Sequence, residues 1–102
     1  MNQDPKTALV INAIPHMDKF EKVTEYFSSL YSIFQNHGAT NTLKLRTSEQ
    51  IFGDADIMAT AVIEFPNKKA IEDAFSSDEF TSLGNAHETL YKIFDVRICD
   101  LH

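Results

Sequence analysis

The fold that this sequence predicts is clearest in IMATAVIEFPNKKAIEDAFSSDEF, residues 57–80. Residues 57–65 are almost continuously apolar, which is typical of a central strand that is covered on both faces. Pro66 ends that strand, because proline has no amide hydrogen to donate to a sheet. Asn67 and Asp78 both suit the N-cap position of a helix. The stretch therefore predicts a strand, then a helix, then a further short helical segment.

The N-terminal part of the chain predicts another strand followed by a helix. Residues 7–14 are apolar and β-branched, and Pro15 stops them, as expected for a buried strand. Asp18 is expected to cap the next helix, with Glu21 completing a capping box. Apolar residues then recur at helical spacing as far as Gly38, which suits the left-handed position that ends many helices.

Two more strands complete the expected elements. Residues 40–49 alternate between polar and apolar side chains, which predicts a half-buried strand with Leu43 and Leu45 on its apolar face. Residues 52–56 have the composition of a turn that leads into the strand at 57–65. Residues 90–101 predict the last strand, with alternating faces formed by Phe94, Val96 and Ile98 and by Asp95, Arg97 and Cys99.

The expected order is therefore β-α-β-β-α-β, within one domain that spans residues 1–102. This is the α+β, ferredoxin-like sandwich, in which an antiparallel sheet carries both helices on one face. The other face should be polar if it meets water. The strand at 57–65 offers no solvated face, since Met58, Thr60, Val62 and Glu64 lie opposite a wholly apolar set. We therefore expect a second copy to cover that face, giving a homodimer.

Composition limits the classes of function. The net charge of -6 and the pI near 5.0 disfavour binding to nucleic acids or to anionic membranes. Cys99 is the single cysteine, so a disulfide-stapled secreted fold is excluded. Residues 1–6 lack an apolar run of signal-peptide length, and no segment reaches the length of a membrane helix. The expected location is the cytoplasm.

A resemblance to a known family begins at residues 61–83, AVIEFPNKKAIEDAFSSDEFTSL. A strand that ends in Phe65-Pro66, followed by a short helix and the motif Ser77-Asp78-Glu79-Phe80, resembles a domain-of-unknown-function family of the dimeric α/β-barrel superfamily. The resemblance covers residues 59–83. The rest of the chain agrees with the family in the order of its elements more than in its residues. Antibiotic-biosynthesis monooxygenase-like and EthD-like proteins are wider relatives.

The resemblance implies two sheets packed face to face in a dimer, with a pocket in each subunit between the sheet and the helices or loops. It implies no single activity, because the superfamily includes cofactor-free oxygenases, isomerases, haem enzymes and proteins without a known reaction. Two positions depart from the family pattern. Asp78 replaces a proline, and Asn85-Ala86-His87 stands where an arginine is common, so a ligand contact made by that arginine is not carried over to this chain.

Two polar residues interrupt the apolar strands and are candidate site residues. Glu64 could act as a general base or ligand anchor in a cavity wall. The favoured interpretation is a strand-end carboxylate that meets solvent or pairs with Arg46 of the neighbouring strand. Asn12 could bind a ligand carbonyl, and it could equally satisfy a backbone group or a contact between subunits.

The histidines and arginines supply the remaining candidates. His16 follows a strand end and could face the pocket as a base, and His87 stands at the position of the family arginine. No metal-binding spacing of histidine or cysteine occurs, so no metal and no cofactor is expected, although the superfamily includes haem enzymes. Arg46 could bind an anionic ligand, whereas Arg97 is expected to pair with Asp95.

Three functional hypotheses follow from these residues. The leading one is a homodimer that binds a small, partly apolar molecule in a pocket beside the sheet. The second is a cofactor-free monooxygenase or isomerase with Glu64 or a pocket histidine as its base. The third is a structural dimerisation module without a ligand. Fold analogy does not choose among them.

Overall fold

The computed structural model describes residues 6–54 and 56–100. The elements follow one another as β1 (Thr7–Pro15), the 3-10 turn η1 (Met17–Lys19), α1 (Phe20–Asn36), β2 (Asn41–Arg46), β3 (Ala59–Phe65), α2 (Lys68–Ser76), α3 (Asp78–Thr81), α4 (Ala86–Leu90) and β4 (Tyr91–Asp100). The prediction of an α+β, ferredoxin-like fold is confirmed, and the expected helix and short helical segment after β3 are α2 and α3, with α4 added before β4.

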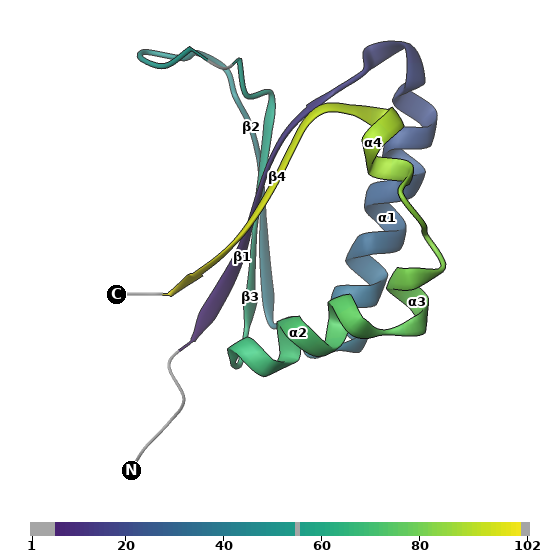
Figure 1. The fold of residues 1–102 in the computed structure, drawn as a ribbon. Helices are drawn as coiled ribbons and strands as arrows, with labels where there is room; N and C mark the ends of the chain where they lie inside the picture. The colour runs from purple at the N-terminus through teal and green to yellow at the C-terminus, as the bar shows by residue number, and fades with distance from the viewer. Residues whose placement is uncertain (1–5, 55, 101–102) are drawn as a thin grey trace.

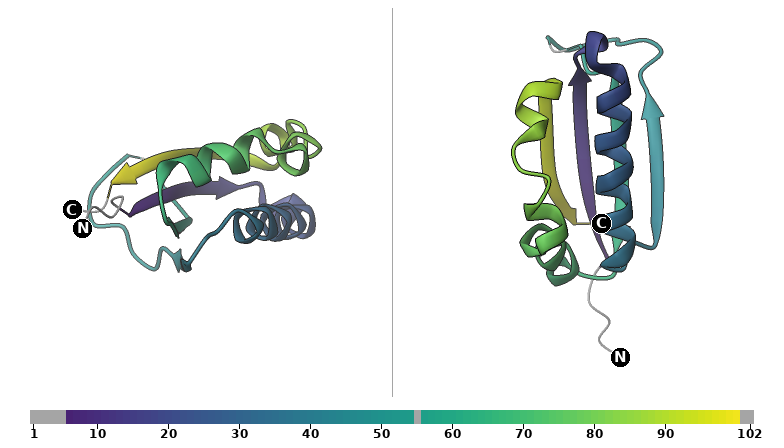
Figure 2. Two further views of the ribbon diagram at one scale, coloured as in Figure 1. Left: turned by 90° about the horizontal axis from the view of Figure 1, so that it is seen from below. Right: turned by 90° about the vertical axis from the view of Figure 1, so that its right-hand side faces the viewer.

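The sheet has the strand order β2-β3-β1-β4, and each neighbouring pair is antiparallel. All helices lie on one face of this sheet, which leaves the other face open (Figure 1). α1 runs along the middle of the sheet, and α2 to α4 form a second column over the β4 side (Figure 2). β2 is therefore an edge strand that no helix covers fully.

The core lies between the sheet and α1. Most of the residues of β1 and β3 that point to the helices are buried, and they alternate along each strand, as the period of a strand requires. On α1 the buried positions recur every three or four residues, so they form one face of the helix. The rings of Phe34 and Phe65 meet edge to face at 5.9 Å, which joins α1 to β3.

The helix starts differ from the expectation at two places. Asp18 does not cap α1, because it lies within η1, and α1 begins at Phe20 without a side-chain cap. The cap of α3 is Ser77 rather than Asp78, since the Ser77 hydroxyl accepts a hydrogen bond from the amide of Phe80 at 3.2 Å. Asn67 does cap α2, accepting from the amide of Ala70 at 2.9 Å.

The apolar face of β2 is also the reverse of the expectation. Leu43 and Leu45 are each 53% exposed, because they lie on the open face of the sheet. Lys44 faces the helices instead. A half-buried strand was expected from the alternation, but alternation identifies two faces without showing which of them meets the core.

The remaining differences concern element ends. β2 and β3 are shorter than the expected strands at 40–49 and 57–65, so a long connection replaces the short turn. In Figure 1 this connection extends from one end of the sheet on the side away from the helices. α4 was not predicted, and Leu101 of the last expected strand lies outside the described residues.

Candidate functional site

A mainly apolar cavity lies between α1 and the sheet and has a volume of about 320 Å³. We call it the interlayer cavity. Its wall comes from α1, the three strands β1, β2 and β3, and the start of β4, through Ile11, Ala13, Pro15, Phe20, Val23, Thr24, Phe27, Ser28, Lys44, Leu45, Ala59, Thr60, Ala61, Tyr91 and Phe94. The wall is therefore mainly apolar.

Small side chains on the sheet explain why the core leaves space here. Ala13 and Ala59 are directly paired across β1 and β3, and Ala61 follows Ala59 on the same face. Three methyl groups cannot fill the distance between a sheet and a helix. The residues of α1 that line the cavity are spaced three or four apart, so one face of the helix closes it.

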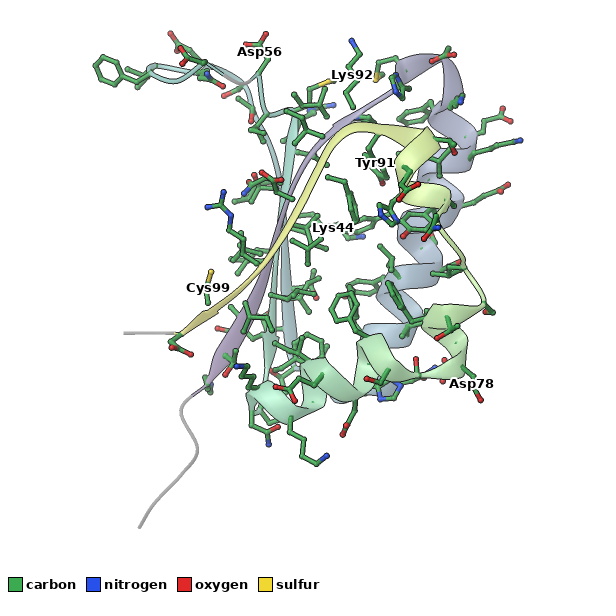
Figure 3. All side chains as sticks on the ribbon, viewed as in Figure 1. Lys44, Asp56, Asp78, Tyr91, Lys92 and Cys99 are labelled. Carbon is green, nitrogen blue, oxygen red and sulfur yellow. The ribbon has the colours of Figure 1, made fainter. Side chains whose placement is uncertain are left out.

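Lys44 is the charged member of the wall. Its cross-strand partner is Ala61, so its side chain points from the sheet toward α1 (Figure 3). The ammonium nitrogen Nζ lies 4.8 Å from the ring centre of Tyr31 and 5.5 Å from that of Phe27. These distances are typical of cation–π contacts, which hold the ammonium beside the cavity.

Tyr91 supplies a neutral polar group to the same wall. Burial raises the pKa of Tyr91 to about 12, and the neighbouring Tyr26, whose ring centre is 6.2 Å away, contributes to the shift. Burial also raises the pKa of Tyr26. The Tyr91 hydroxyl therefore keeps its proton at neutral pH and can donate a hydrogen bond.

A smaller cavity of about 160 Å³ adjoins the interlayer cavity, and the two share Ile11 and Phe94 in their walls. His87 lines this smaller cavity. Its ring lies 5.6 Å from the ring of Phe94, so it packs against an aromatic side chain. His87, at the position of the family arginine, therefore lies outside the wall of the interlayer cavity and in that of the smaller one.

The open face carries two of the predicted site residues. Asn12 accepts a hydrogen bond from the Thr60 hydroxyl at 2.8 Å, across the β1–β3 pair. Glu64 lies on the same face four residues along β3 from Thr60. This explains how the polar Asn12 fits within an apolar strand, because its side-chain oxygen has a partner.

Arg46 does not pair with Glu64, contrary to the expectation. In the β2–β3 register Arg46 is opposite Ala59, whereas Glu64 is opposite Asn41. The two residues lie at opposite ends of the strand pair and on opposite faces. The expected pair of Arg97 and Asp95 is confirmed at 3.9 Å.

His16 lies just beyond β1, where its backbone amide donates to the carbonyl of Leu90 at 2.9 Å. None of the five predicted site residues, Asn12, His16, Arg46, Glu64 and His87, is part of the interlayer cavity wall. The structure brings Asn12 and Glu64 onto one face and leaves the other three apart. Their functional roles stay predictions.

Sequence reasoning missed Lys44, Tyr91 and the alanines that leave the cavity open. One signal was present. Lys44 alternates with Leu43 and Leu45 along β2, so it must face the helices if the leucines face outward. The sequence does not show which of the two sets faces the helices, and the position of Lys44 was therefore missed. The pairing of Ala13 with Ala59 depends on the register of β1 and β3, which cannot be derived from the sequence alone.

The sheet order and the helices on one face define the class as proteins of the ferredoxin-like fold. Within this class, residues 7–100 match the family described as a domain of unknown function (DUF1330). The chain belongs to that family. The resemblance seen at residues 59–83 is therefore confirmed. A comparison with curated proteins finds no match.

Solved structures show the same fold at low sequence identity. An EthD family protein from Bacillus halodurans has a TM-score of 0.70 and 14% identity, covering 95% of this chain and 99% of its own. SnoaB, a cofactor-independent oxygenase from Streptomyces nogalater, has a TM-score of 0.71 and 17% identity, with coverage of 96% and 94%. An antibiotic biosynthesis monooxygenase-like protein from Nitrosomonas europaea has a TM-score of 0.71 and 10% identity, with coverage of 99% and 94%.

Among the described residues, no helix is long and apolar enough to cross a membrane.

Proposed function

We propose that this protein is a homodimer that binds a small, partly apolar molecule in the interlayer cavity of each subunit. The observation that carries the proposal is the cavity itself, with a volume of about 320 Å³ and a mainly apolar wall. Sites for small molecules are usually concave and apolar, with a few polar groups that orient the ligand. Lys44, Tyr91, Thr24 and Ser28 are the polar groups that suit this role.

The open face supports the homodimer. Three neighbouring strands place Leu43, Val62 and Val10 in one cross-strand row, which gives an apolar centre. The next row places Leu45 beside the hydrogen-bonded pair of Thr60 and Asn12. Since this face has no helix over it, a second copy packed sheet to sheet would remove the exposed leucines from water.

The chemistry of the wall favours binding over base catalysis. Its fifteen residues include no carboxylate, imidazole or thiol. A general base must reach the proton that it removes, either directly or through one water. Glu64 and His16 lie outside the cavity, so the enzymatic alternative would need a ligand bound elsewhere. Likeness to an oxygenase at 17% identity concerns the fold.

A pair of variants on α1 tests the cavity. Ser28 lines the cavity and its neighbour Ser29 does not, although both are exposed on the same helix. The probe is N-phenyl-1-naphthylamine, a neutral aromatic molecule whose fluorescence rises in apolar surroundings. We expect it to bind the wild type and the Ser29→Phe variant alike, and the Ser28→Phe variant much more weakly.

The proposal is wrong if the wild type does not bind the probe, or if Ser28→Phe and Ser29→Phe reduce binding equally. Thermal unfolding of both variants shows whether each is folded. A third variant, Ala59→Phe, fills the cavity from the sheet side. It should repeat the loss, because Ala59 lies on the opposite wall.

A further inference from the structure

The position of Lys44 suggests which class of ligand the cavity takes. The side chain crosses from β2 toward α1, and its ammonium lies over the rings of Tyr31 and Phe27 (Figure 3). Phe27 is itself part of the cavity wall. Lys44 is itself exposed, so the positive charge lies where this apolar space meets solvent.

No carboxylate of the described residues forms an ion pair with Lys44. The chain has fifteen acidic and nine basic residues, so carboxylates are plentiful. Lys44 is also the one charged side chain among the fifteen wall residues. An aromatic face attracts a cation but leaves its hydrogen-bond donors able to meet an anion.

We propose that Lys44 is the anion-binding group of the interlayer cavity, and that the ligand is a mainly apolar molecule bearing one acidic oxygen group. This inference rests on the proposed function, because it assigns a ligand class to the same site. The apolar part would lie against Phe20, Phe27 and the alanines of the sheet. The acidic group would meet the ammonium of Lys44 at the β2 edge.

One further feature fits an acidic ligand. Arg46 lies on the same face of β2 as Lys44 and adds a second positive charge at that edge, although it is outside the wall. The Tyr91 hydroxyl belongs to β4 at the opposite edge of the sheet, so it would meet another part of the ligand. If Lys44 only packed its stem against the two rings, the cavity would bind acidic and neutral ligands equally well.

Two probes that differ in one group test the inference. 1-Anilinonaphthalene-8-sulfonate carries the same ring system as N-phenyl-1-naphthylamine with one sulfonate added. Fluorescence titrations of both probes are made with the wild type and with Lys44→Met, which keeps a stem of four atoms and removes the charged ammonium group. Lys44→Arg keeps the charge. Lys92→Met removes an exposed charge that lies outside the cavity wall.

We expect Lys44→Met to weaken binding of the sulfonate probe about tenfold, as for loss of one hydrogen bond to a charged group. Binding of the neutral probe should change little. Lys44→Arg should restore most of the affinity for the sulfonate probe, and Lys92→Met should leave both affinities unchanged. Added salt should weaken the binding of the sulfonate probe and leave that of the neutral probe unchanged.

The inference fails if Lys44→Met weakens the binding of both probes equally, or of neither probe. In that case the wild type would still bind the neutral probe, and Ser28→Phe would not. That pattern leaves the proposed binding function standing. If neither probe binds the wild type, the proposed function fails together with the ligand class. Equal losses in Lys44→Met and Lys92→Met would show a general effect of protein charge and would also overturn the assignment to Lys44.

Discussion

At the scale of the residue, Tyr91 links the packing of the site to pH. Burial is the main reason that its pKa rises from 10.0 to about 12, and Tyr26 adds to the shift. The folded protein therefore keeps the Tyr91 proton at pH values where the unfolded chain has lost it. The stability that depends on this proton is complete below about pH 10 and is lost as pH rises toward about 12.

We predict that Tyr91→Phe makes the stability less sensitive to alkaline pH. The free energy of unfolding is measured by urea titration at several pH values between 9 and about 12. The wild type should lose stability more steeply than the variant over this interval. Part of the slope should remain in the variant, because burial also raises the pKa of Tyr26. Identical slopes would contradict the assignment to Tyr91.

A second prediction at this scale concerns the core. Ile63 has no exposed surface, whereas Ile51 is 80% exposed in the connection between β2 and β3. Ile63→Ala should lower the free energy of unfolding by about 2–5 kcal/mol, because it removes buried methyl groups and leaves a space. Ile51→Ala removes the same atoms from an exposed site and should have little effect. Chemical denaturation of the two variants gives the comparison.

At the scale of the element, the end of α1 depends on a glycine. Gly38 has a φ of +97°, and a Cβ there would meet nothing closer than Pro66 at 3.8 Å. The cost of Gly38→Ala therefore comes from the backbone, and we expect a loss of about 1–2 kcal/mol in unfolding free energy. Ser29→Ala in the same helix is the control. Equal stability of Gly38→Ala and the wild type would contradict this account of how α1 ends.

Sequence patterns predicted the elements better than their ends. Local chemistry determines the order of strands and helices, the cap of α2 at Asn67 and the end of α1 at Gly38. These features could therefore be predicted from the sequence. The start of α1 was not, because the 3-10 turn η1 takes up Asp18 before the helix begins. α4 was missed because residues 86–90 are too few to show a helical period.

The candidate site was largely hidden from the sequence for a physical reason. The interlayer cavity exists because Ala13 and Ala59 are paired, and pairing is decided by the register of β1 and β3. The inward direction of Lys44 likewise depends on which face of the sheet the helices cover. Asn12 and Glu64 were candidate site residues because they are polar residues within apolar strands, but they lie on the open face.

At the scale of the whole molecule, the open face should join two copies. We predict that Leu43→Lys converts a dimer into a monomer, because it places a charge in the apolar row of that face. Met17→Lys is the control, since Met17 is 57% exposed but lies in η1 away from the open face. Sedimentation equilibrium gives the mass of each variant. A wild type that is monomeric would remove the basis for the dimer.

The central claim is that a small molecule binds between α1 and the sheet. The most direct measurement is a set of intermolecular nuclear Overhauser effects between N-phenyl-1-naphthylamine and the methyl groups of the protein. We predict contacts from the probe to Val23, Ala59 and Ala61, which line the interlayer cavity. Contacts confined to Leu43, Val10 and Val62 of the open face would contradict the claim.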